Sequence, residues 1–145
     1  MERSPWAKRG LTYGKKWYNK AMARKVLIVD DSLFSRTALS NIFAKEGFEI
    51  CGEAENGIEA VERYRALRPD LVTMDILMSK DQDGDGVAAV KAIMKIDPNA
   101  KIIVISAMNQ NAFVVEALQA GAREFITKPF DHVRIAAIAK KVCEN

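Results

Sequence analysis

Residues 26–31, Val-Leu-Ile-Val-Asp-Asp, decide the fold, because four apolar residues run there directly into two aspartates. A short, continuous apolar run is typical of a strand that is buried on both faces of a parallel sheet. Residues 71–74 and 102–105 repeat this character, and shorter versions lie at 50–52 and 124–126. The sequence therefore predicts five strands.

Helical patterns follow all five strands. Apolar residues recur there at the spacing of an amphipathic helix, as they do at 39–43 and 135–142. Residues typical of helix ends and starts agree with these positions: Gly47, Pro69, Pro98 and Gly121 for the ends, and Ser32, Asn56 and Asp131 for the N-caps. Five strands alternating with five helices predict an α/β fold, a doubly wound five-stranded parallel sheet with helices on both faces.

Composition excludes several classes of protein. The chain has 145 residues, 49% hydrophobic and 28% charged, which fits one globular domain and not a disordered chain. No apolar run approaches the roughly 18 residues that cross a bilayer, and none near the start resembles a signal peptide. Cys51 and Cys143 are few and far apart, so we expect reduced thiols in a cytoplasmic protein.

The basic residues are concentrated at the N-terminus. Residues 1–25 hold eight of the 22 Lys and Arg but one of the 19 Asp and Glu, so residues 26–145 carry 14 basic and 18 acidic residues, about −4. We interpret residues 1–23 as a disordered basic and aromatic leader, from an upstream start or an expression vector, and residues 24–145 as the domain. The alternative is an arm that docks on nucleic acid, an anionic surface or the acidic body.

Polar residues follow the strands where each of them ends. Asp30 and Asp31 follow the first strand, Asp75 the third, Ser106 the fourth and Lys128 the fifth. In a doubly wound sheet, ligands bind outside these carboxyl ends. Three converging carboxylates repel one another unless a cation such as Mg²⁺ lies among them. With a lysine and a hydroxyl to contact phosphoryl oxygens, the set predicts a site for phosphoryl transfer.

Four motifs carry a family resemblance. Val-Asp-Asp at 29–31, Met-Asp-Ile-Leu-Met at 74–78, Ile-Ser-Ala at 105–107 and Phe-Ile-Thr-Lys-Pro-Phe at 125–130 resemble the response-regulator receiver domain. The resemblance covers residues 24–143, and no effector domain follows, so the chain is similar to the single-domain chemotaxis (CheY-like) type. It implies a flavodoxin-like sheet with strand order 2-1-3-4-5 and a phosphorylation-dependent switch of a two-component pathway.

The resemblance also implies roles for the residues around the phosphoacceptor. Asp75 would accept the phosphoryl group from a histidine kinase. Mg²⁺, with Mn²⁺ as a substitute, would be held by Asp31, Asp75 and the backbone carbonyl of Leu77, while Asp30 would act through water. Ser106 and Lys128 would then hold the transferred group.

A second set of implied roles concerns the output. Phe125 would turn inward as Ser106 moves toward the phosphate, and the bond between Lys128 and Pro129 would be cis. The face made by the fourth helix, fifth strand and fifth helix would change its affinity for a target, such as a flagellar motor component. The chain would have no DNA-binding domain, and it would not be an enzyme beyond its own phosphorylation and dephosphorylation.

The loop after Asp75 departs from the family pattern. Ser79 replaces the usual proline, and residues 80–86 make the loop about three residues longer. Its acidic residues match half of an EF-hand loop, but the twelfth position, which requires Glu, is Ala92. We expect a solvated acidic loop, with a weak second cation site as the alternative. Leu77 and Met108, both apolar, flank the approach of water, and we expect slow self-dephosphorylation.

Two other functions are alternatives to the switch. A haloacid-dehalogenase-like phosphatase needs Asp-x-Asp on the first strand and a cap domain. Asp30 and Asp31 are adjacent, so their side chains cannot point the same way on a strand, and we expect no room for a cap in a chain of this length. A phosphorylation-independent docking module on a receiver fold stays open because of the altered loop.

Overall fold

The structure is a computed structural model that describes residues 23–78 and 85–144. All but the last residue of the proposed leader and most of the acidic loop therefore lie outside the described residues. The strands are β1 (Lys25–Val29), β2 (Glu49–Ala54), β3 (Leu71–Asp75), β4 (Ile102–Ser106) and β5 (Glu124–Thr127). The helices are α3 (Leu33–Lys45), α4 (Gly57–Leu67), α5 (Asp85–Ile96), α6 (Asn111–Ala120) and α7 (His132–Glu144). None of these helices is long and apolar enough to cross a membrane.

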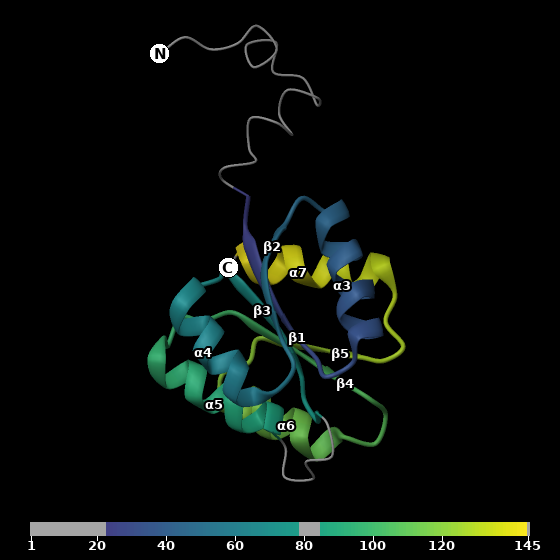
Figure 1. Ribbon diagram of the computed structural model, residues 1–145. Helices are drawn as coiled ribbons and strands as arrows, with labels where there is room; N and C mark the ends of the chain where they lie inside the picture. Colours follow the sequence, from purple (N-terminus) through teal and green to yellow (C-terminus); the bar gives the residue numbers. More distant parts are fainter. Residues whose placement is uncertain (1–22, 79–84, 145) are drawn as a thin grey trace, which may run out of the picture.

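The five strands form one parallel sheet in the order β2-β1-β3-β4-β5, as predicted (Figure 1). Every residue of β3 and β4 is buried, which explains their unbroken apolar runs. The edge strands β2 and β5 are partly exposed and have shorter apolar runs. From β1, the chain adds β2 on one side of the sheet and β3 on the other, so the strand order reverses between β1 and β3. The carboxyl ends of these two strands therefore lie side by side at the switch point of the sheet.

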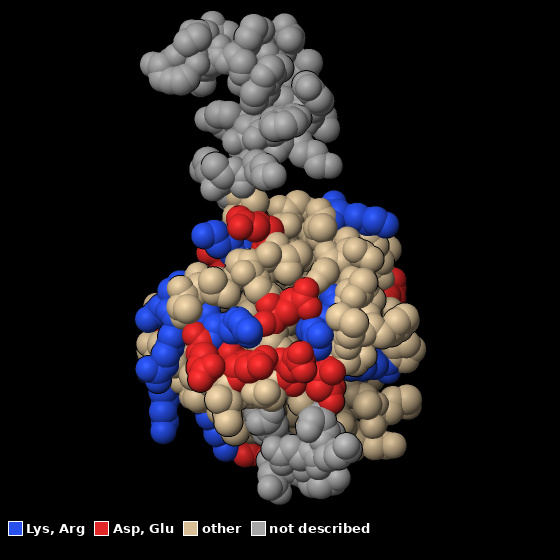
Figure 2. Space-filling view, viewed as in Figure 1, with Lys and Arg blue, Asp and Glu red and all other residues tan. Residues whose placement is uncertain are grey.

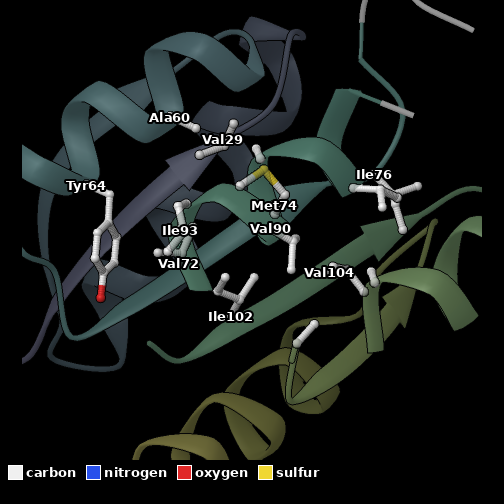
Figure 3. Close-up of a cluster of buried hydrophobic side chains, with 14 of the residues drawn as sticks. Val29, Ala60, Tyr64, Val72, Met74, Ile76, Val90, Ile93, Ile102 and Val104 are labelled. Atoms are coloured by element: carbon white, nitrogen blue, oxygen red, sulfur yellow. The ribbon is translucent and has the colours of Figure 1, made fainter. Parts of the chain in front are cut away.

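Helices cover both faces of the sheet. Helices α3 and α7 pack on one face, and α4, α5 and α6 pack on the other (Figure 1). On the second face, Val72, Met74 and Val104 of the sheet meet Val90 and Ile93 of α5 (Figure 3). These two apolar layers fix the sheet so that its carboxyl ends form a rigid edge.

Local signals explain where the helices begin. The side chains of Ser32 and Asn56 accept hydrogen bonds from backbone N–H groups in the first turns of α3 and α4, at 3.2 and 2.9 Å. Asp131 accepts one from Val133 at 3.1 Å before α7. The three predicted caps are confirmed. Helix α5 begins at Asp85.

Candidate functional site

Three aspartates meet at the carboxyl ends of β1 and β3. One carboxylate oxygen from each of Asp30, Asp31 and Asp75 lies within 4.8 Å of the others. Asp30 and Asp75 are 1% and 5% exposed, whereas Asp31 is open to solvent. The sheet order thus brings together the carboxylates that the sequence predicted to converge.

Lys128 reaches this cluster from the far side of β4. Its Nζ lies 3.1 Å from Asp30 Oδ2 and 3.6 Å from Asp75 Oδ2. Its backbone N–H donates to the carbonyl of Ser106 at 2.7 Å, and the bond to Pro129 is cis, as predicted. One lysine therefore contacts two of the three carboxylates while its backbone is tied to the residue that ends β4.

Ser106 and Phe125 lie on the neighbouring strands β4 and β5. Ser106 is buried at the end of β4, opposite Thr127 of β5. Phe125, two residues before Thr127, is 37% exposed. Leu77 is partly buried against the core, and its backbone N–H donates to the Asp75 carboxylate.

The electrostatics of the site leave negative charge unbalanced. Burial and the nearby charges of Asp30 and Asp31 raise the pKa of Asp75 to about 7, although Lys128 and the Leu77 N–H act in the opposite direction. Burial lowers the pKa of Lys128, but Asp75 and Asp30 outweigh it and raise that pKa overall. Acidic side chains also form a band between α3 and α4, toward this edge (Figure 2).

A hard divalent cation fits this arrangement. The donors are all carboxylate oxygens, which Mg²⁺ and Mn²⁺ prefer. The raised pKa of Asp75 marks charge repulsion that such a cation would relieve.

Gly86 is a residue of this site that the sequence interpretation missed. Its N–H donates to the carbonyl of Ile76 at 3.1 Å. A Cβ at this position would lie 2.3 Å from the carbonyl oxygen of Asp75 and 2.6 Å from that of Ile76. Both are backbone atoms, so they cannot move away as the end of a flexible side chain could. In the sequence, Gly86 is the last residue of the lengthened loop at 80–86, and no local pattern there indicates these contacts.

The comparisons with known proteins agree on one family. Residues 26–140 match the family model of the response regulator receiver domain. The chemotaxis protein CheY of Thermotoga maritima is 55% identical over 121 residues, which cover 83% of this chain and 98% of that protein. CheY of Bacillus subtilis is 49% identical over 120 residues, with the same two coverages. A chain in the crystal structure of the CheX–CheY–BeF3–Mg²⁺ complex from Borrelia burgdorferi aligns with a TM-score of 0.75 and 40% identity, covering 82% of this chain and 88% of that one.

The pKa of Asp75 predicts an unusual pH dependence of stability. The unfolded carboxyl has a pKa near 4, so between about pH 4 and 7 the folded metal-free chain keeps a proton that the unfolded chain has lost. Stability from this group is present at low pH and is lost as the pH rises toward 7. We expect Asp75→Asn to be more stable than wild type at pH 8 by about 2–4 kcal/mol, and by less at pH 5.

Urea unfolding in EDTA at the two pH values measures this difference. Asp131→Asn, which alters the cap of α7 and leaves the three clustered carboxylates in place, is the matched control and should keep the wild-type pH dependence. Equal pH dependence in wild type and Asp75→Asn would contradict the prediction.

Close packing at Gly86 predicts a costly Gly86→Ala substitution. The added methyl group must displace the backbone at Asp75 and Ile76, so we expect a loss of about 2 kcal/mol or more in unfolding free energy. Gly52→Ala is the matched control, because the atoms that its Cβ would meet all belong to side chains, the closest being the movable Cδ1 of Leu67 at 2.7 Å. Urea unfolding of both variants tests this, and equal losses would show that backbone crowding at the acceptor is unimportant.

Proposed function

The chain belongs to the response regulator receiver domain family as a CheY-type, phosphorylation-dependent signalling switch, and from this premise we propose that Asp75 accepts the phosphoryl group of a histidine kinase. One observation carries the proposal. A buried carboxylate lies beside two others, all within 4.8 Å, with Lys128 Nζ 3.6 Å away. A purely structural role does not explain such a cluster, because buried carboxylates that repel one another destabilise the fold.

The carboxylates of Asp31 and Asp75, with the backbone carbonyl of Leu77, would hold Mg²⁺, and Asp30 would act through water. Mn²⁺ would substitute. The Borrelia burgdorferi complex contains BeF3 and Mg²⁺, which supports this assignment. The bound cation supplies positive charge that stabilises the oxygens of the transferring phosphoryl group.

The chain's own residues then carry out an in-line transfer. A carboxylate oxygen of Asp75 forms a bond to phosphorus while the P–N bond of the phosphohistidine breaks, and that electron pair returns to the imidazole nitrogen. Lys128, already 3.6 Å from Asp75 Oδ2, turns to a phosphoryl oxygen, and the Ser106 hydroxyl donates to another. The product is an acyl phosphate on Asp75. In this proposal the chain transforms no other substrate and is not an enzyme in the usual sense.

The output would use the face formed by α6, β5 and α7. Movement of Ser106 toward the phosphoryl group would let Phe125, now 37% exposed, turn inward between β4 and α6. The same elements also expose Val115 and Val133, which suits binding of a protein target such as a flagellar motor component. We place the switch in the cytoplasm, consistent with its free thiols at Cys51 and Cys143.

Acetyl phosphate labelling tests the phosphoacceptor. With Mg²⁺, wild type should gain the mass of one phosphoryl group in a form that is stable to acid and labile to base, and Asp75→Ala should gain none. Asp70→Ala, an exposed aspartate at the other end of β3, is the control that should be labelled normally. Labelling of Asp75→Ala would refute the site. No labelling of folded wild type would favour the phosphorylation-independent docking module.

Apolar residues near the acceptor predict a long-lived phosphorylated state. Leu77 is partly buried and Met108 is exposed, and neither can orient an attacking water. We expect Leu77→Asn to hydrolyse its acyl phosphate about tenfold faster than wild type, because an amide can position that water. Loss of the labelled mass with time measures the rate, with Leu77→Met as the control. A wild-type half-life of seconds, unchanged in Leu77→Asn, would overturn the prediction.

A further inference from the structure

Arg36 is a buried cation that the proposed chemistry does not use. It is 8% exposed and lies in the first turn of α3, where its N–H donates to the carbonyl of Ser32 at 3.0 Å. A positive charge is unfavourable near a helix N-terminus, and burial of a charge costs free energy unless the charge is well paired. The contacts of its guanidinium group must therefore compensate for this position.

These contacts lead to the metal-binding end of β1. Arg36 Nη1 donates to the backbone carbonyl of Asp30 at 2.7 Å, and Nε donates to Glu53 Oε1 of β2 at 2.8 Å. The N–H of Asp30 donates to the carbonyl of Ala54 at 3.0 Å, and its Oδ1 accepts from the N–H of Ser32 at 2.9 Å. The backbone N–H and carbonyl of Asp30 are thus both fixed, one by β2 and one by Arg36.

The two sides of the carboxylate cluster are held in different ways. Asp75 is a residue of β3, which pairs with β1 on one side and with β4 on the other. Asp30 and Asp31 instead follow β1, which ends at Val29, and β2 ends at Ala54. The guanidinium group of Arg36 therefore provides a link at the point where the strand pairing of β1 stops.

We propose that Arg36, oriented by Glu53, is a positioning residue that sets the divalent-cation affinity of the carboxylate cluster. The inference rests on the proposed function, because it assumes that Asp30, Asp31 and Asp75 hold Mg²⁺. Partners of this kind, which contact the backbone or far side of metal ligands, commonly change metal affinity by about tenfold or more when removed.

Positioning and simple charge predict effects of opposite sign. Arg36 is a positive charge near three carboxylates, so by Coulomb repulsion alone its removal would strengthen the binding of a cation. If Arg36 holds the Asp30–Asp31 backbone in place, its removal weakens binding instead. The direction of the change in Mg²⁺ affinity therefore separates the two roles.

Isothermal titration of the metal-free full chain with MgCl₂ makes this measurement. We expect the Kd of Arg36→Met to rise about tenfold. Arg36→Lys should show a similar loss, because one ammonium group lacks the planar fork that donates to two acceptors at once. Glu53→Gln, which keeps an acceptor but removes the charge that orients the guanidinium group, should show a smaller loss of the same sign.

Tyr64→Phe is the matched control for lost stability. Its hydroxyl donates to Asp97 Oδ2 at 2.8 Å, so the variant loses a partly buried hydrogen bond near the C-terminal end of α4. We expect a lower melting temperature with an unchanged Kd for Mg²⁺. A role of Arg36 in stability alone would give the same pattern in Arg36→Met.

Each outcome decides the proposal. An unchanged or lower Kd in Arg36→Met overturns it, and if that variant does not fold, Arg36→Lys, which keeps the charge, decides by the same criterion. Normal Mg²⁺ binding by wild type with unaffected variants would refute the role of Arg36 and leave the proposed function intact. Absence of Mg²⁺ binding by folded wild type would overturn the proposed metal site and this inference together.

Discussion

The structure is organised around the repulsion of three carboxylates within 4.8 Å of one another. Two of them are buried, so solvent screens them little, and the pKa of Asp75 rises to about 7. Several groups from separate parts of the chain partly offset this charge: the ammonium group of Lys128 and the backbone N–H groups of Leu77 and Ser32. None of them removes the repulsion, and a site that keeps unbalanced charge is suited to a cation and a transferable anionic group.

Strand order is what makes this crowding possible. Because β1 and β3 are adjacent although β2 lies between them in sequence, Asp30 and Asp75 leave the sheet side by side. The buried apolar layers on both faces hold those strands in register and do not relax to separate the charges. The close approach of α5 adds a second constraint. The helix packs so near the backbone at Asp75 that position 86 has no room for a side chain.

Much of this arrangement could be predicted from the sequence, for identifiable physical reasons. Continuous apolar runs specify buried parallel strands, and residues at the strand ends must then share one edge, which placed Asp30, Asp31, Asp75 and Lys128 together. Gly86 and Arg36 were missed because their importance arises from contacts that local pattern does not encode. The cost of a Cβ at Gly86 depends on two carbonyls ten or more residues away. Arg36 resembled any polar helix residue, and only the tertiary structure shows that Glu53 and the carbonyl of Asp30 surround it.

Lys128 connects the charge at the site to the rest of the molecule. Its Nζ contacts Asp30 and Asp75, while its backbone N–H holds the carbonyl of Ser106, so the two ends of one residue join the carboxylates to β4. A phosphoryl group on Asp75 would share the ammonium group with Asp30, because the three N–H donors of Lys128 already reach two carboxylates at once, Asp30 at 3.1 Å and Asp75 at 3.6 Å. Arg36 contacts the same aspartate from the opposite side, because it donates to the backbone carbonyl of Asp30, whose carboxylate contacts Lys128. In the proposed function, the energy of the switch therefore depends on how firmly Asp30 is held, and this makes the first turn of α3 part of the signalling machinery as well as of the fold.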